Sequence, residues 1–340
     1  MAKLNILVAG STGFIGIQLI KLLIKHKKIK IKYLCGNNSI GKKISFFDKS
    51  LEKKKLPKII RFNKKLLKEI DVVFTALPNG EAQKISNYLL PRNTLIDLSA
   101  DFRLNKIKEY EKYYNIKHKS HKNIGNSIYA LPEIVDKKIK DFNIIGCPGC
   151  YPTSILLPLI PLIKENLIVS KTIIIDSKSG YSGAGRGVYK KYKNKNLFNS
   201  LKAYGVGFHR HNSEIFQELG NIKKKGINLI FTPHIVPMFR GILSTIYVDL
   251  KKKSSILNIQ NILKKFYKNK RFIKIMPVNT SIGTNDVMNT NNCYISICKT
   301  KYKNKIVLLS AIDNLIKGGA GQGVQNMNLK FGYKEHEGLL

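Results

Sequence analysis

The sequence predicts an α/β protein in which a doubly wound parallel sheet is combined with an α+β domain containing a mixed sheet. Up to about residue 149, short apolar strands alternate with helical segments, as in βαβ units. From residue 172 onward, long strands follow one another with few helices between them. With 340 residues, of which 43% are hydrophobic, the chain is long enough for two cores.

The net charge of +39 comes from a lysine-rich background rather than from a recognition surface. The chain has 60 Lys and Arg against 21 Asp and Glu, and only seven of the 60 are Arg. The lysines form short runs along the whole chain, which is typical of a solvated surface. A nucleic-acid interface needs clustered Arg or aromatic side chains that read the bases, and none is evident. We therefore expect no nucleic-acid partner.

Targeting signals and cysteine usage indicate the compartment. The first residues lead directly into a short apolar strand, without the longer apolar run and cleavage site of a signal peptide. No apolar run approaches the roughly 20 residues of a membrane span. Five scattered cysteines do not suit a disulfide framework. We expect a cytoplasmic protein that has no membrane partner.

A glycine-rich turn near the N-terminus predicts a dinucleotide site. Residues 4–9 are expected to form a strand, and a helix is expected from about Phe14. Between them, Gly10, Gly13 and Gly16 have GxxGxxG spacing, which lets a pyrophosphate approach the N–H groups at the start of a helix. In this strand–turn–helix context the motif favours a Rossmann-type domain over a glycine turn without a ligand.

The segment after the second predicted strand favours NADP over NAD. About 20 residues past the last glycine, an NAD enzyme places an acidic side chain on the ribose hydroxyls. This chain instead has "GNNSIGKK" there. Asn37, Asn38 and Ser39 can donate hydrogen bonds to a 2′-phosphate, and Lys42 and Lys43 can neutralise it. The alternative is that both lysines belong to the general background.

Three further segments extend the predicted parallel sheet. They are "DVVFTALPNG" with a helix from Glu81, "TLIDLSADFR", and "FNIIGC". The first two strands end in loops at the sheet edge where such folds bind ligands. Leu77 and Pro78, in the first of these loops, are predicted cofactor contacts.

The stretch "IIGCPGCYPTS" places two cysteines around a turn. Pro148 and Gly149 suit the centre of a turn, and Pro152 suits the first turn of a helix that later prolines could interrupt. Cys150 is therefore expected at a helix N-terminus, which favours its thiolate, and is the predicted nucleophile. Two buried structural thiols would also account for the pair. A thioredoxin-type redox couple usually begins a helix at its first cysteine, which Pro148 and Gly149 argue against. A zinc site lacks a second ligand pair, so we expect no metal.

Proton transfer to and from this thiol is assigned to "HRHNSEI". Either His209 or His211 can act as acid or base near neutral pH, and Glu214 lies within one helical turn to orient an imidazole.

The seven arginines stand out against the lysine background, because a guanidinium binds phosphate or carboxylate in two-pronged fashion. The arginines in the segments already singled out are Arg103, Arg186, Arg210 and Arg240. The loop 179–187 adds Ser179, Ser182 and several glycines as donors, unless it is only a surface loop.

These motifs together resemble the N-acetyl-gamma-glutamyl-phosphate reductase family. The resemblance rests on "GSTGFIG", "IDLSADFRL", "PGCYPTS", "KSGYSGAGR", "HRHNSEI", "FTPHIVPMFRGIL" and "IDNLIKGGAGQGVQNMN", and it covers nearly the whole chain in order. It differs in Cys147, where the family usually has Asn, and in Ala130, where the family usually has Gly. The resemblance implies NADPH-dependent reduction of an acyl phosphate to an aldehyde through a cysteine thioester, in arginine biosynthesis, by a homo-oligomer (dimer or tetramer).

The resemblance also implies the domains and the site residues. Residues 1–149, completed by 314–340, would bind NADP(H), and 150–313 would form the catalytic domain. The acid or base would be His209 rather than His211. Substrate binding is assigned to Arg103, Ser179, Arg186 and Arg210. Predicted cofactor contacts are Gly10, Ser11, Thr12, Gly13, Phe14, Ile15, Gly16, Asn37, Ser39, Leu77, Pro78, Ser182, Gly183 and Asn314.

Three different functions stay open at this point. Aspartate-semialdehyde dehydrogenase catalyses the same chemistry on a shorter substrate, and a cofactor-binding sensor would bind NADP without turnover. A nucleic-acid-binding module would bind nucleic acid tightly at physiological salt. We also hypothesise that Cys147 and Cys150, at the two ends of one turn, form a reversible disulfide that blocks the nucleophile.

Overall fold

A computed structural model describes residues 3–135, 137–186, 199–252 and 254–340. The chain divides into two compact units. Unit 1 consists of Met1–Pro148 with Gly319–Leu340, and unit 2 consists of Gly149–Gly318. Unit 2 is therefore inserted in the sequence between two parts of unit 1.

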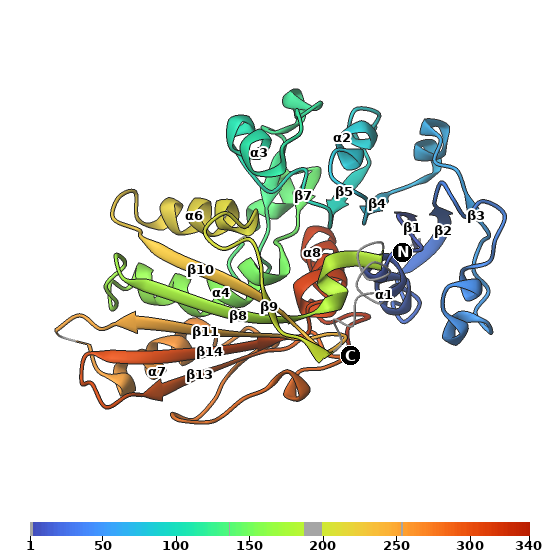
Figure 1. Cartoon of the computed structure of the whole chain (residues 1–340). Helices are drawn as coiled ribbons and strands as arrows, with labels where there is room; N and C mark the ends of the chain where they lie inside the picture. The colour runs from blue at the N-terminus through green and yellow to red at the C-terminus, as the bar shows by residue number, and fades with distance from the viewer. Residues whose placement is uncertain (1–2, 136, 187–198, 253) are drawn as a thin grey trace. The chain divides into compact units, whose positions relative to one another are not determined.

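Unit 1 is built on a parallel sheet of seven strands in the order β3-β2-β1-β4-β5-β7-β6 (Figure 1). The order reverses at β1, so the chain winds outward in both directions, as in dinucleotide-binding folds. The strands are β1 (Leu4–Ala9), β2 (Ile29–Cys35), β3 (Ile59–Ile60), β4 (Val72–Thr75), β5 (Thr94–Asp97), β6 (Ser127–Tyr129) and β7 (Ile144–Gly146). The predicted doubly wound sheet is confirmed.

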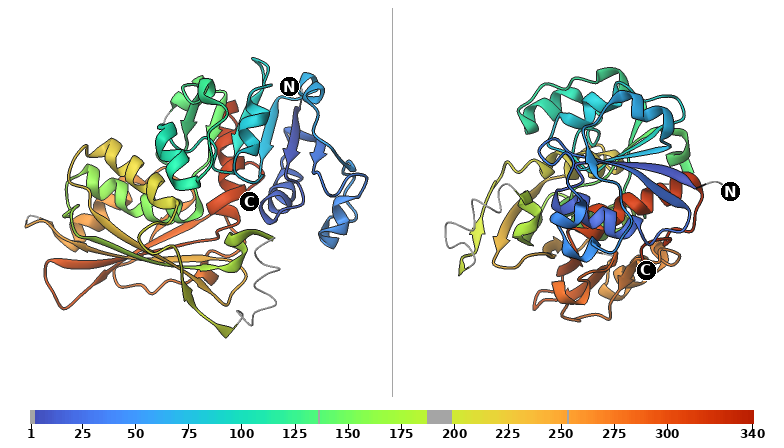
Figure 2. Two further views of the ribbon diagram at one scale, coloured as in Figure 1. Left: turned by 45° about the horizontal axis from the view of Figure 1, so that its top comes forward. Right: turned by 90° about the vertical axis from the view of Figure 1, so that its right-hand side faces the viewer.

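Helices cover both faces of this sheet. The helices are α1 (Phe14–Leu23), α2 (Glu81–Ser86), α3 (Ile107–Tyr114) and the C-terminal α8 (Gly321–Phe331). Figure 2 shows α1 and α8 together on one face, with α2 and α3 on the other. Short 3₁₀ turns are Ile44–Phe46, Lys49–Leu51, Lys64–Glu69, His121–Asn123 and Lys137–Asp141. Strands β4, β5 and β7 are buried along their whole length and mostly apolar because both faces are covered.

Helix α8 is held in unit 1 by side-chain amides as well as by apolar contacts. A Cβ added at Gly323 would lie 2.9 Å from the side chain of Leu98, so a small residue is needed at this approach. The Nδ2 of Asn326 donates to the carbonyl of Ala130 at 2.9 Å. The Oδ1 of Asn328 lies 2.9 Å from Nε2 of His26. The small and amide residues of the segment therefore let the helix pack closely.

Unit 2 contains a mixed sheet of seven strands in the order β12-β13-β14-β11-β8-β10-β9 (Figure 1). β10 runs parallel to β8 and β12 runs parallel to β13, whereas the remaining neighbours are antiparallel. The strands are β8 (Ile173–Gly180), β9 (Lys202–Ala203), β10 (Leu229–Val236), β11 (Ile242–Asp249), β12 (Ile273–Ile275), β13 (Cys293–Lys299) and β14 (Lys305–Ile312). The predicted mixed sheet is confirmed.

Among the described residues of unit 2 are the helices α4 (Cys150–Lys164), α6 (His211–Ile222) and α7 (Ile256–Phe266), and α4 contacts β11, β14, α6 and α7. Further turns are Tyr181–Ala184, Thr284–Asp286 and the π-helical Ile316–Ala320. The sequence suggested that prolines could interrupt α4, but the helix continues through Pro158 and Pro161. Pro161 has no N–H for the carbonyl of Leu157, and the hydroxyl of Tyr267 donates to that carbonyl at 2.6 Å. In the described part of the chain, no helix is long and apolar enough to span a membrane.

Candidate active site

Unit 1 has a cavity at the carboxyl ends of its central strands, with a volume of about 810 Å³. Gly10 follows β1, Asn37 follows β2, and Arg61 follows β3 in its wall. Leu77 and Pro78, after β4, complete this side of the cavity. Four of these five were predicted cofactor contacts, and Arg61 was not. The position matches the sheet edge where doubly wound folds bind ligands.

Backbone geometry requires glycine in the turn beside this cavity. Gly10 has φ of 85°, and a Cβ there would lie 2.2 Å from the carbonyl oxygen of Ala76. A Cβ at Gly16 would lie 2.2 Å from the carbonyl oxygen of Gly10. Helix α1 begins at Phe14, so its first-turn N–H groups lie at the positive end of the helix dipole. Thr12, Gly13 and Ile15 belong to the same turn and helix start. The turn therefore fits the pyrophosphate of a dinucleotide.

Further polar residues predicted for cofactor binding have different environments. The hydroxyl of Ser11 is buried and donates to the carbonyl of Cys35 at 3.1 Å. Ser39 is also buried. Lys42 and Lys43 do not belong to the cavity wall, and the Nζ of Lys42 lies 4.5 Å from the ring centre of Phe46. Arg61 is the guanidinium in that wall.

Two buried carboxylates hold the loops that frame the cavity. Asp97, at the end of β5, accepts hydrogen bonds from the N–H groups of Ser99 and Asp101 at 2.9 Å each. Burial and the neighbouring Asp101 carboxylate raise the pKa of Asp97. Asp101 accepts from the N–H of Gly80 at 2.7 Å and from the hydroxyl of Tyr110 at 2.6 Å. These bonds fix the loop that carries Leu77 and Pro78.

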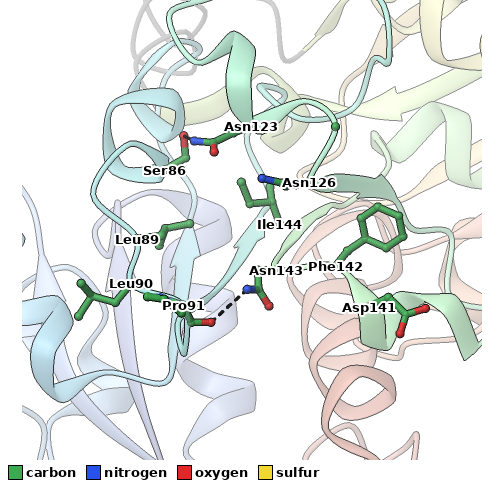
Figure 3. A pocket seen from close by; sticks show the side chains of 11 residues that line it. Ser86, Leu89, Leu90, Pro91, Asn123, Asn126, Asp141, Phe142, Asn143 and Ile144 are labelled. Carbon is green, nitrogen blue, oxygen red and sulfur yellow. Dashed lines mark hydrogen bonds between the residues drawn. The ribbon is translucent and has the colours of Figure 1, made fainter.

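A second cavity of unit 1, of about 490 Å³, lies near the amino ends of β5 and β7 (Figure 3). Its wall includes Phe142 and the side chain of Asn143, whose Nδ2 donates to the carbonyl of Pro91 at 3.1 Å. The Nδ2 of Asn123 donates to the hydroxyl of Ser86 at 3.1 Å. This is the sheet edge opposite the carboxyl ends of the strands, so we do not assign the dinucleotide to it.

Arg103 and Cys147 are both buried inside unit 1. The Nε of Arg103 donates to the carbonyl of Cys147 at 2.7 Å, and another guanidinium nitrogen donates to the carbonyl of Leu98 at 3.2 Å. Burial raises the pKa of the Cys147 thiol to about 12, and the Nδ2 of Asn326 lies 3.4 Å from its sulfur. Cys147 is therefore held as a thiol, which does not favour the disulfide hypothesis.

Cys150 is the first residue of α4 and the second residue of unit 2, and its thiol is half-buried. Gly149 is the N-cap, so Cys150 lies in the first turn of the helix, at the positive end of the helix dipole, which favours a thiolate. A Cβ added at Gly318 would lie 2.7 Å from the Cβ of Cys150. The nucleophile predicted from sequence is therefore confined by close packing against glycine.

Glu214 and His211 adjoin the N-cap of α4. The Oε2 of Glu214 accepts the N–H of Gly149 at 2.8 Å, and its Oε1 lies 3.8 Å from Nε2 of His211. The His211 ring covers Gly149 so closely that a Cβ there would lie 2.5 Å from Nε2. Glu214 is fully buried and His211 is 6% exposed. The structure thus brings together the predicted carboxylate, one predicted histidine and the turn that carries the nucleophile.

His209 lies in an aromatic environment next to His211. The two imidazole centres are 4.7 Å apart, and the rings of Tyr151, Tyr204 and Phe231 lie 5.4 to 5.6 Å from His209. Burial and the positive charge of Arg210 lower the pKa of His209 to about 4. His209 is therefore neutral at physiological pH.

The loop after β8 and the segment after β14 are joined by hydrogen bonds. Asn314 accepts the N–H of Gly241 at 2.7 Å and donates to the hydroxyl of Ser182 at 3.0 Å. A Cβ added at Gly183 would lie 3.5 Å from the Asn314 amide nitrogen. The hydroxyl of Ser179 donates to the carbonyl of Gly180 at 3.0 Å. The amide of Asn314, predicted to contact the cofactor, therefore connects two loops.

The arginines of unit 2 differ in their surroundings. Arg240 pairs with Asp313 at 3.0 Å and donates to Asn289 at 2.6 Å, so its guanidinium has protein partners. Arg210, between the two histidines, is exposed. Arg186 is half-buried at the end of the loop, and Gly187, the last residue of the predicted anion-binding loop, lies outside the described residues.

Comparisons with known proteins decide the family. Residues 5–142 match the model of the semialdehyde dehydrogenase NAD binding domain, and residues 150–314 match that of the semialdehyde dehydrogenase dimerisation domain. The N-acetyl-gamma-glutamyl-phosphate reductase of Acinetobacter baumannii strain SDF is 42% identical over 338 residues, covering 98% of this chain and 97% of that protein. The chain belongs to the N-acetyl-gamma-glutamyl-phosphate reductase family. The family member from Desulforamulus reducens is 39% identical, covering 98% of this chain and 96% of its own length.

Solved structures agree with this family at the level of fold. Aspartate semialdehyde dehydrogenase II of Vibrio cholerae has a TM-score of 0.71 at 16% identity, covering 97% of this chain and 98% of that one. The aspartate semialdehyde dehydrogenase of Candida albicans, solved with NADP, has a TM-score of 0.69 at 18% identity, covering 96% and 98%. The mixed sheet and the parallel sheet are thus shared with semialdehyde dehydrogenases.

Proposed function

We propose that the protein reduces N-acetyl-L-glutamyl 5-phosphate to N-acetyl-L-glutamate 5-semialdehyde with release of phosphate, as an NADPH-dependent enzyme of arginine biosynthesis. The observation that carries the proposal is a half-buried cysteine at a helix N-terminus whose preceding residue is held by a buried carboxylate and covered by an imidazole. Nucleophile, base and orienting group are the parts that covalent acyl transfer requires.

The chemistry of the chain's own residues follows from this arrangement. The Cys150 thiolate attacks the acyl carbon, a C–S bond forms, and the C–O bond to phosphate breaks. The positive end of the α4 dipole, where Cys150 lies, stabilises negative charge that develops on the carbonyl oxygen. NADPH, when bound, supplies the hydride that reduces the thioester. The C–S bond then breaks, the aldehyde leaves, and the cysteine is regenerated.

The substrate's anionic groups need cationic partners in unit 2. Half-buried Arg186 and exposed Arg210 are the arginines of unit 2 predicted for this role, and Arg240 pairs with Asp313. A guanidinium holds phosphate or carboxylate with two parallel hydrogen bonds. Arg103 was also predicted for this role, but its Nε and one further nitrogen already donate to backbone carbonyls.

The cavity of unit 1 favours NADP over NAD. Its wall has Asn37 after β2 and Arg61 after β3, whereas an NAD site places a carboxylate after the second strand. A guanidinium beside this position can pair with a 2′-phosphate. We therefore assign the pairing with the 2′-phosphate to Arg61 instead of Lys42 and Lys43, which do not lie in the cavity wall.

The open face of the unit 2 sheet supports a homodimer. Ile174 on β8, Ile230 on β10 and Tyr247 on β11 are 46 to 58% exposed on neighbouring strands. Adjacent exposed apolar side chains of this size mark an interaction surface. Ile230→Lys is expected to convert the dimer to a monomer in sedimentation experiments. None of the five cysteines, all within the described residues, is in a disulfide, which suits a reducing cytoplasm.

The function is tested by NADPH formation from NADP and N-acetylglutamate semialdehyde, with and without phosphate. Phosphate-dependent turnover is expected in the parent and in Cys298→Ser, a control at another half-buried thiol. Cys150→Ser should lose turnover while still binding NADP. Turnover with aspartate semialdehyde instead would identify the shorter acyl phosphate as the substrate. NADP binding without any turnover would indicate a cofactor-binding sensor.

A further inference from the structure

His209 and His211 are both in the candidate site, and their geometry assigns them different roles. We propose that His209 is a positioning residue that caps α6, and that the His211–Glu214 pair takes the proton from Cys150. The inference rests on the proposed function, because it concerns the proton of the nucleophilic thiol. It reverses the preference for His209 that the sequence suggested.

The first step of the argument concerns the tautomer of His209. Its Nδ1 accepts the backbone N–H of His211 at 3.1 Å. A ring nitrogen that accepts a hydrogen bond cannot carry a proton, so the neutral ring carries its single proton on Nε2. Neutral His209 therefore has no free lone pair with which to accept the proton of a thiol. Protonation at Nδ1 would require the bond to His211 to break.

The second step concerns the groups that face His209. Tyr151 comes from α4, Tyr204 from the preceding loop, and Phe231 from β10. The charged or titratable neighbours on its own segment are Arg210 and His211. Among the described residues, no carboxylate forms an ion pair with this imidazole. The surroundings oppose an imidazolium, in agreement with the lowered pKa of His209.

The third step concerns what His209 does for α6. Its Nδ1 takes the N–H of His211, and its carbonyl takes the N–H of Asn212 at 2.9 Å. These are N–H groups of the first turn, which have no partner within a helix. His209 thus caps the helix as an Asx turn would, and fixes the turn that carries His211 and Glu214.

The fourth step concerns the partner of the thiol. His211 covers Gly149, the residue before Cys150, and its Nε2 lies 3.8 Å from Glu214. Glu214 also accepts the N–H of Gly149, so one carboxylate serves both the imidazole and the nucleophile turn. A carboxylate beside the ring stabilises the imidazolium that forms when the thiol proton is taken. This environment is the opposite of that of His209.

Asparagine separates the two roles, because its Oδ1 can replace Nδ1 as the acceptor two residues before His211. We expect His209→Asn to keep phosphate-dependent turnover within about tenfold of the parent, and His209→Ala to lose more. His211→Asn should lose about 10²- to 10⁴-fold, the usual effect of removing a general base. Melting temperature and NADP affinity control for folding.

A spectroscopic arm tests the tautomer without reference to turnover. In the full chain with ¹⁵N-labelled histidine, the His209 signal, identified by its loss in His209→Asn, should show the proton on Nε2 at every pH from 5 to 9. The proposal is overturned if His209 titrates in that range, or if folded His209→Asn loses as much activity as His211→Asn. A parent without turnover would defeat the proposed function, whereas the tautomer would still be decided by the spectrum.

Discussion

The two units build their sites from different parts of the chain. In unit 1 the glycine turn after β1 depends on close approach between backbone segments, since there is no room for a Cβ at Gly10 or Gly16. In unit 2 the nucleophile turn depends on side chains, since Glu214 holds Gly149 and His211 covers it. Unit 1 should therefore be most sensitive where side chains are added, and unit 2 where they are removed. Each prediction below tests one side of this difference.

The largest effect is expected from adding a single methyl group in unit 1. Gly10→Ala places a Cβ against the carbonyl of Ala76 in a backbone conformation with φ of 85°. We expect NADP affinity to fall by more than about 100-fold, or unit 1 to lose about 3 kcal/mol or more of stability. Gly41→Ala is the matched control, with φ of 81° and no atom within 4 Å. Its cost should stay at about 1–2 kcal/mol. Equal effects would refute the backbone argument.

Removing a side chain in unit 2 should affect chemistry and leave cofactor binding intact. Glu214→Ala leaves the N–H of Gly149 without its carboxylate, at a cost of about 1–3 kcal/mol in stability. Turnover should fall by about 100-fold because His211 loses its partner. Glu214→Gln keeps an acceptor, so it should recover stability but not turnover. Loss of NADP affinity in either variant would contradict the assignment of cofactor binding to unit 1 and of the chemistry to unit 2.

The pKa of His209 predicts a change in stability with pH. The folded pKa of about 4 lies below the ordinary value of 6.5, so between these values the unfolded chain binds more protons. Stability should therefore fall as pH drops from 6.5 towards 4, by up to about 3 kcal/mol from this group. Urea denaturation of the parent and His209→Asn at several pH values measures the difference. An identical slope in both would exclude this contribution.

The smallest effect is expected from a side chain in the cavity of unit 1. Arg61→Gln should raise KM for NADP by about tenfold and leave KM for NAD unchanged, because only the 2′-phosphate pairs with the guanidinium. Lys42→Gln removes a charge outside the wall and serves as the control. If Lys42→Gln changed KM for NADP as much as Arg61→Gln, the assignment of Lys42 and Lys43 to the 2′-phosphate, made from the sequence, would be preferable.

Local patterns predicted much of the fold. The first strand has the predicted bounds, and α1 begins at the predicted Phe14, because an apolar run and a glycine turn define both. Strands β3 and β6 were missed, since two and three residues are too short to show a period. The uninterrupted course of α4 could not be predicted either. It depends on Tyr267, which lies 110 residues from the carbonyl it binds.

The candidate site was predictable where one short motif contains the chemistry. Cys150 and the HRH segment were singled out in this way, and their catalytic roles stay predictions. The bond from Glu214 to Gly149 joins residues 65 apart, and only the fold brings them together. Two features of the sequence could have pointed to Arg61: it is one of only seven arginines, and it directly follows the apolar pair Ile59–Ile60. Its place in the cavity wall, however, depends on strand β3. Amide and hydroxyl side chains such as Asn314 and Ser11 have partners within the protein that the sequence did not indicate, and their contact with the cofactor stays a prediction.

The division of unit 1 into two sequence segments has a consequence for synthesis on the ribosome. Residues 1–148 emerge first, but the carbonyl of Ala130 and the imidazole of His26 have their partners on α8, close to the end of the chain. Unit 2 is complete in the sequence before α8 is made. The N-terminal segment therefore cannot complete its fold until α8 has been synthesised, whereas all residues of unit 2 are available earlier. We therefore expect unit 2 to complete its fold before unit 1, the reverse of the N-terminal-first order usual for domains during translation.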